Sequence, residues 1–119
     1  MDLGGRGIRS LECNASGCLI VAGTASGGND FKLYTWTGVA ADAPVLRSAD
    51  LTALNSNGSF EGIAQLPTGA LSTWATQSVQ LIVDNGDAVY YNDAVIAKEL
   101  TQNNFKKFRS ETVQIGTAL

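Results

Sequence analysis

The sequence predicts an all-β domain made of two four-stranded antiparallel blades of β-propeller type, which complete a closed propeller by oligomerisation. Three observations predict this class. Short apolar runs recur between turn residues, helical periodicity is almost absent, and parts of the first half recur in the second. The 119 residues suit a single domain, which the repeat divides at about 4–57 and 58–116.

Eight strands are expected, four in each unit. Each candidate is rich in Val, Ile, Leu or aromatic residues and is bounded by Gly, Asn, Asp or Ser. The candidates are residues 7–13, 18–24, 31–37, 45–51, 61–66, 79–84, 94–98 and 108–115. The one helical turn expected is 97–103, and it is short because it has no clean apolar face.

The repeat depends on two matches with the same spacing. The tripeptide LIV at 19–21 recurs at 81–83, and the dipeptide RS at 47–48 recurs at 109–110. The dipeptide GI at 7–8 recurs at 62–63 with a shorter spacing, which places an insertion within residues 67–77 of the second unit. Four antiparallel strands repeated in tandem are typical of propeller blades.

Two blades alone leave an apolar sheet face open on each side of the wedge that they form. Such patches mark association sites, and cyclic symmetry lets copies of one chain close a ring. Because propellers contain about four to eight blades, self-association into a homo-oligomer is expected, and the trimer is the favoured assembly.

Composition excludes some classes of partner. The net charge of −3 and a pI near 4.7 argue against nucleic acid, and no apolar run has the length of about 18 residues that a membrane helix needs. The residues after Met1 have neither a basic region nor an apolar core. The expected location is therefore cytoplasmic, with no membrane partner.

Histidine is absent from the chain, which removes Ser-His-Asp catalysis and histidine-ligated zinc. Two cysteines, Cys13 and Cys18, are too few for a complete zinc site. They lie across a predicted hairpin turn, where they form either a disulfide or a pair of buried free thiols. Free thiols are the favoured interpretation because the composition resembles that of cytosolic proteins. No cofactor is expected.

The first strand of each blade lines the central channel of a propeller, so its charged residues are the candidate ligand-binding residues. These are Arg6, Arg9, Glu12 and Glu61, with a small polar molecule as ligand. Glu61 matches Arg6 in the repeat, which suggests a ring of ion pairs, a ligand or metal site, or catalysis. Odd spacing is expected to put Arg9 and Glu12 on opposite faces.

Other motifs have structural interpretations. Arg47 and Arg109 occur once per unit and are expected to make hydrogen bonds between blades. Trp36 and Trp74 are more often core residues than stacking platforms for a sugar or an aromatic ligand. Residues 84–87 are better explained by a turn than by a calcium loop.

Several motifs also carry a resemblance to a known family. The motifs RGIRSLE, FEGIA and FRS, in that order, resemble a family of bacterial proteins of unknown function. That family is predicted to be propeller-like and is similar in strand pattern to the phytase-like esterase propellers. The resemblance covers roughly residues 2–115 and implies a fold without an established reaction. A ligand-binding or scaffold module is therefore the first hypothesis, and a metal-dependent phosphoesterase is the alternative.

Overall fold

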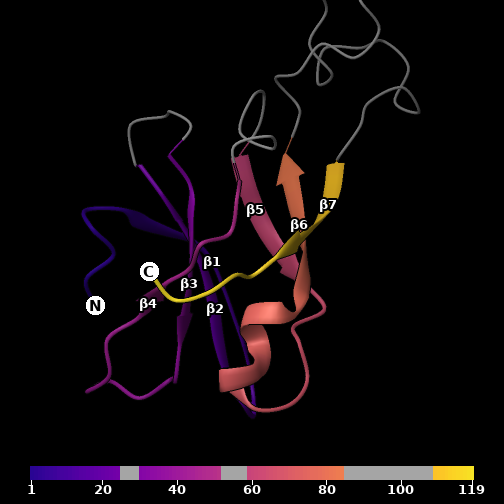
Figure 1. Ribbon diagram of the computed structural model, residues 1–119. Helices are drawn as coiled ribbons and strands as arrows, with labels where there is room; N and C mark the ends of the chain where they lie inside the picture. The colour runs from indigo at the N-terminus through magenta and orange to yellow at the C-terminus, as the bar shows by residue number, and fades with distance from the viewer. Residues whose placement is uncertain (25–29, 52–58, 85–108) are drawn as a thin grey trace, which may run out of the picture.

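The computed structural model describes residues 1–24, 30–51, 59–84 and 109–119, and at residues 59–61, 84 and 109 only the backbone. These residues form two antiparallel sheets, of four and three strands, and one short helix (Figure 1). The prediction of an all-β fold is confirmed, and neither sheet closes on itself. The expected strand at 94–98 and helical turn at 97–103 lie outside the described residues.

The first sheet has the order β1-β2-β3-β4. Its strands are β1 (Gly7–Asn14), β2 (Gly17–Gly23), β3 (Lys32–Trp36) and β4 (Val45–Leu46). All seven residues of β2 are buried, because this apolar strand has side chains packed on both of its faces. Gly23 ends β2 where a Cβ atom would lie 2.4 Å from the ring of Phe31, so a larger residue would displace that ring.

Strand β4 is shorter than the predicted strand at 45–51. After Leu46 the chain pairs with the carboxy-terminal segment instead, since the N–H of Ser48 donates to the carbonyl of Thr117 and the N–H of Leu119 donates to that of Leu46. Leu51, at the far end of the predicted strand, is buried in the core.

The second sheet has the order β5-β6-β7, with β5 (Ser59–Ala64), β6 (Ser78–Asp84) and β7 (Arg109–Gln114). Strand β7 pairs directly with β6, and Ser110 lies opposite Ile82 just as Tyr34 lies opposite Ile20 in the first sheet. The match of RS at 109–110 with RS at 47–48 is therefore wrong as a structural equivalence. In space β7 corresponds to β3 and not to β4.

A 3-10 helix, η2 (Leu71–Thr76), lies within the insertion at 67–77, where no helix was predicted. Its Trp74 is fully buried, and the indole N–H donates to the carbonyl of Gly69 at 3.2 Å. Trp74 is thus a core residue. The inserted residues supply the largest side chain of the core.

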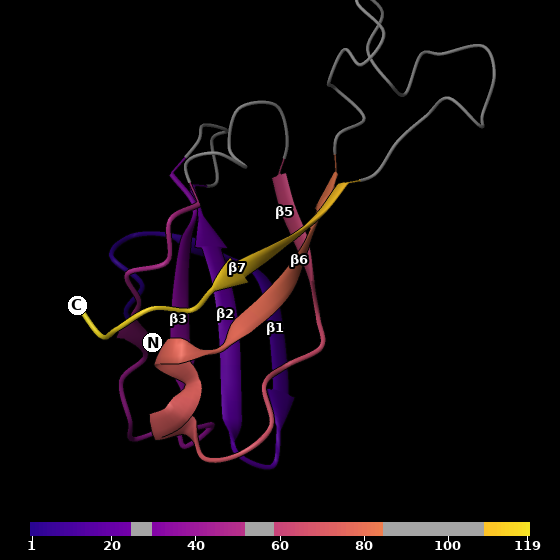
Figure 2. The ribbon, with the colours of Figure 1, turned by 45° about the vertical axis from the view of Figure 1, so that its right-hand side comes forward.

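The main core lies between the two sheets. Figure 2 shows β6 and β7 across the front of β2 and β3, and apolar side chains of both sheets form one cluster. Its members include Leu19, Val21, Leu33, Leu81, Val83 and Val113. A second, smaller cluster lies on the outer face of the first sheet, where Leu3 covers Ile20, Ala22 and Tyr34. Because two faces of the first sheet are packed, β2 is buried on both sides.

Candidate functional site

Three of the four candidate site residues lie on β1 and β5, and Arg6 directly precedes β1. These two strands are the first strands of their sheets and are in contact with each other. Each strand contains a β-bulge. Arg9 is the extra residue between Ile8 and Ser10, and Glu61 is the extra residue between Phe60 and Gly62. Bulges redirect side chains and are common beside functional sites. Two of the predicted residues therefore occupy irregular positions of neighbouring strands.

The bulge in β1 overturns one prediction about Arg9. Its Nη2 donates to the carbonyl of Thr24 at 2.9 Å, and its guanidinium carbon lies 5.9 Å from the ring centroid of Phe31. Phe31 belongs to the core between the sheets, and Glu12 lies opposite Leu19 of the same core. Arg9 and Glu12 thus lie on the same face, because the extra residue shifts the alternation of β1 by one.

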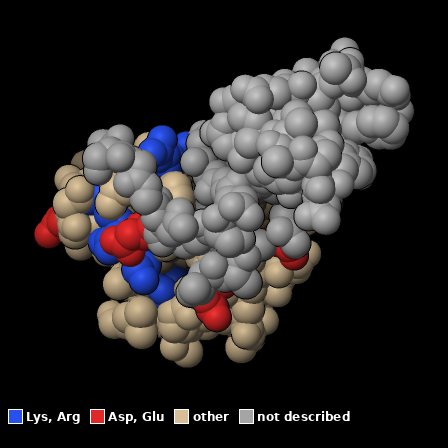
Figure 3. Space-filling view, turned by 90° about the horizontal axis from the view of Figure 1, so that it is seen from above, with Lys and Arg blue, Asp and Glu red and all other residues tan. Residues whose placement is uncertain are grey.

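Arg6 belongs to a separate cluster at the start of β1. Its Nη2 forms an ion pair with the carboxylate of Asp30, and its Nε donates to the Asp30 carbonyl at 3.2 Å. The hydrogen bond with Asp30 raises the pKa of Arg6, and Lys32 Nζ lies 4.0 Å from the same carboxylate. Figure 3 shows lysine and arginine side chains gathered near acidic groups at this end of the molecule.

The pairing of β5 with β6 also shows that Arg6 and Glu61 do not occupy equivalent positions in the two sheets. Gly62 lies opposite Ile82, the repeat partner of Ile20, and Ile20 itself lies opposite Leu11. Gly62 therefore corresponds to Leu11 and not to Gly7, so the match of GI at 7–8 with GI at 62–63 is wrong in space. A ring that alternates Arg6 with Glu61 loses its basis. The side chain of Glu61 lies outside the described part of the structure.

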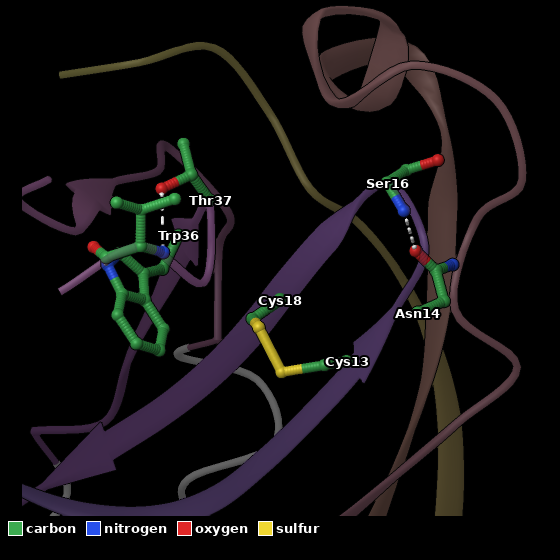
Figure 4. Close-up of a disulfide and its surroundings, with 7 residues drawn as sticks. Cys13, Asn14, Ser16, Cys18, Trp36 and Thr37 are labelled. Carbon is green, nitrogen blue, oxygen red and sulfur yellow. Dashed lines mark hydrogen bonds between the residues drawn. A yellow bond between two sulfur atoms is a disulfide. The ribbon is translucent and has the colours of Figure 1, made fainter.

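Cys13 and Cys18 form a disulfide, so the prediction of free thiols is wrong (Figure 4). The two residues lie directly opposite each other in the β1–β2 ladder, because the strands are joined by a two-residue turn between Asn14 and Gly17. Cys13 is exposed and Cys18 is buried. The prediction failed because it relied on composition, whereas the register of the hairpin decides which thiols meet.

Metal ligation finds no support in the residues that the structure describes. Both sulfur atoms are occupied by the disulfide. Within residues 1–24, 30–51, 59–84 and 109–119, no three His, Cys, Asp or Glu side chains gather into a group that could hold a metal ion. The phosphoesterase alternative therefore gains no observation in its favour.

Arg47 does not link the two sheets as expected. Its Nε donates to the hydroxyl of Thr35 at 2.9 Å; Thr35 lies on β3, and Arg47 directly follows β4 of the same sheet. Burial lowers the pKa of Arg47. The side chain of its expected counterpart, Arg109, lies outside the described residues.

A pocket of 330 Å³ lies between the segment after β4 and the end of β7. Its polar lining comes from Ser48, Asp50, Thr112 and Gln114. None of the predicted site residues lines it. No motif in the sequence pointed to this pocket, since it brings together segments that are far apart in the chain.

Comparisons of the chain with protein-family models, curated proteins and solved structures found no match. Among the helical residues that the structure describes, no segment is long and apolar enough to cross a membrane.

Proposed function

We propose that the chain is a ligand-binding or scaffold module of propeller type, and that its ligand lies beside the first strands of two adjacent blades. The observation that carries the proposal is the contact of β1 with β5, combined with the face-to-face packing of their sheets. Neighbouring blades of a propeller pack in this manner, with their first strands nearest the axis.

Arg9 and Glu12 are the residues that fit a small polar ligand best. They lie on one face of β1, they carry opposite charges, and Glu12 is exposed. Within the described part of the chain, Arg9 donates one hydrogen bond, to the carbonyl of Thr24, and its remaining N–H donors suit a ligand. Glu61 follows on the neighbouring strand as the bulge residue of β5.

The proposed module completes its ring with further copies of the chain, and the trimer is the favoured assembly. Support comes from apolar side chains left exposed on both outer faces. Ile8 and Leu11 are 49% and 41% exposed on the first sheet, and Ile82 is 40% exposed on the second. In a ring, the outer face of one copy's first sheet packs on the second sheet of the next copy.

Sedimentation velocity at micromolar concentration tests this assembly. We expect a particle of three 12.4 kDa chains, which Leu11→Asp and Ile82→Asp convert to single chains. Val39→Asp is the matched control, because Val39 is an exposed apolar residue in the turn after β3 and lies on neither β1 nor β6. A wild-type protein with the mass of one chain would overturn the ring.

A further inference from the structure

Arg47 differs from the other arginines whose side chains the structure describes. Arg6 is paired with the carboxylate of Asp30, and the guanidinium of Arg9 lies over the ring of Phe31. Arg47 has neither a carboxylate nor an aromatic ring beside it among the described residues. Its single side-chain hydrogen bond goes to the neutral hydroxyl of Thr35.

Hydrogen bonds fix both the backbone and the side chain of Arg47. Its backbone N–H donates to the carbonyl of Leu33 at 2.9 Å, and the residue forms an isolated bridge with Ala118. The hydroxyl that accepts from Nε belongs to Thr35, which is only 1% exposed. A buried acceptor of this kind orients the guanidinium, while the terminal atoms Nη1 and Nη2 have no partner among the described residues.

The partly buried guanidinium of Arg47 has no neighbouring negative charge among the described residues to replace the water that it loses. Burial lowers the pKa of Arg47, and no described carboxylate lies close enough to counter that effect. Protein interiors accept charged groups where an opposite charge or hydrogen bonds replace the water. An oriented cation with two free nitrogen atoms therefore has the features of a site for an external anion.

We propose that Arg47 binds a small oxyanion, either a carboxylate or a phosphate, through parallel hydrogen bonds from Nη1 and Nη2 to two oxygen atoms. Thr35 is the positioning residue, because its hydroxyl holds Nε and sets the plane of the fork. The site lies on the β3–β4 side of the first sheet. It does not depend on the ring or on the ligand proposed for β1 and β5.

Titration of the protein with sodium phosphate and with sodium acetate, at an ionic strength held constant with sodium chloride, tests the site. The readout is the NMR signal of the arginine Nε–H groups and of the backbone amides of residues 35 and 47. We expect a saturable shift with at least one of the two anions, and the anion that responds identifies the preferred class. Arg47→Gln should weaken the binding at least tenfold.

Two further variants test whether the binding is specific to the guanidinium of Arg47. Lys32→Gln is the matched control, because Lys32 is a cation that already has the carboxylate of Asp30 4.0 Å away, and this variant should bind the anion as the wild type does. Arg47→Lys keeps the charge and the aliphatic stem but loses the fork, so it should bind more weakly even if Arg47→Gln does not fold. Equal responses in wild type and Arg47→Lys, or shifts that never saturate, would overturn the proposal.

Discussion

The two sheets carry the same tripeptide in their central strands but bury it differently. Leu19 and Val21 of β2 are fully buried, as are Leu81 and Val83 of β6. The middle residue distinguishes the sheets, since Ile20 is 0% exposed and Ile82 is 40% exposed. The inner faces of the two sheets are therefore equivalent, whereas their outer faces are not.

The amino-terminal strap, residues 1–6, causes this difference. Its Leu3 packs on Ile20 and Tyr34, and the hydroxyl of Tyr34 donates to the Leu3 carbonyl at 3.0 Å. On the second sheet the outer face carries polar side chains beside Ile82, among which Gln80 donates to Ser110. The comparison teaches that one tripeptide specifies a strand and its inner face, while the outer face depends on what covers it.

The largest expected effect on stability comes from replacing each of the two equivalent isoleucines by alanine. Ile20→Ala should lower the free energy of unfolding by about 2–5 kcal/mol, because it leaves a cavity under Leu3. In the single chain, obtained here on the Leu11→Asp background, Ile82→Ala should cost less than about 1 kcal/mol, because water reaches that side chain when no second copy covers it. Denaturant unfolding of the two variants measures the difference, and equal losses would contradict it.

The disulfide joins β1 and β2 of the first sheet, and the chain has no other cysteine, so the second sheet has no such bond. Removal of the bond therefore measures a stabilisation that only the first sheet has. Cys13→Ala with Cys18→Ala should lower the free energy of unfolding by about 2 kcal/mol, as expected for a short closed loop. The wild type unfolded in the presence of a thiol reductant should match the double variant in stability. The native wild type should show no reaction with an alkylating reagent, and labelling of both cysteines would refute the bond.

Because disulfides persist in oxidising compartments, the same labelling in whole cells tests the predicted cytoplasmic location.

The smallest effect concerns the ion pair that anchors the strap. Asp30→Asn should lower the free energy of unfolding by less than about 1 kcal/mol, because Asp30 is 49% exposed and solvent screens the pair. The hydrogen bond with Asp30 raises the pKa of Arg6 in the fold, so the contribution of the pair is fully present at ordinary pH and is lost only in strong alkali, as the pH rises through that pKa. Molar sodium chloride should remove the difference between variant and wild type. A loss that persists at high salt would show that Asp30 acts through packing.

Local sequence patterns predicted much of the fold. The strands at 18–24, 31–37 and 79–84 fall within one residue of β2, β3 and β6 at each end. The recurrence of the LIV tripeptide marked the central strands of both sheets, because β2 and β6 each contain one copy. The short helix around Trp74 did not follow from the sequence, because a single turn with one buried residue has no detectable period.

The sequence predicted the candidate site less well than it predicted the strands. Strand periodicity placed Arg9 and Glu12 on opposite faces, and a one-residue bulge reversed this. A match of two residues made Glu61 the counterpart of Arg6, and the registers of the two sheets separated them. Bulges and registers depend on the partner strand, which the local pattern does not contain.

By itself, the sequence determined that the chain is all-β and where most of its strands lie. These properties follow from propensity and alternation over a few residues. Only the tertiary structure decided that β7 lies beside β6, that Cys13 meets Cys18 and that Leu3 covers Ile20. It also decided that the guanidinium of Arg47 lies against Thr35, with no counter-ion among the described residues. Each of these results requires segments to meet in a particular register. That register is selected by the packing of the whole chain.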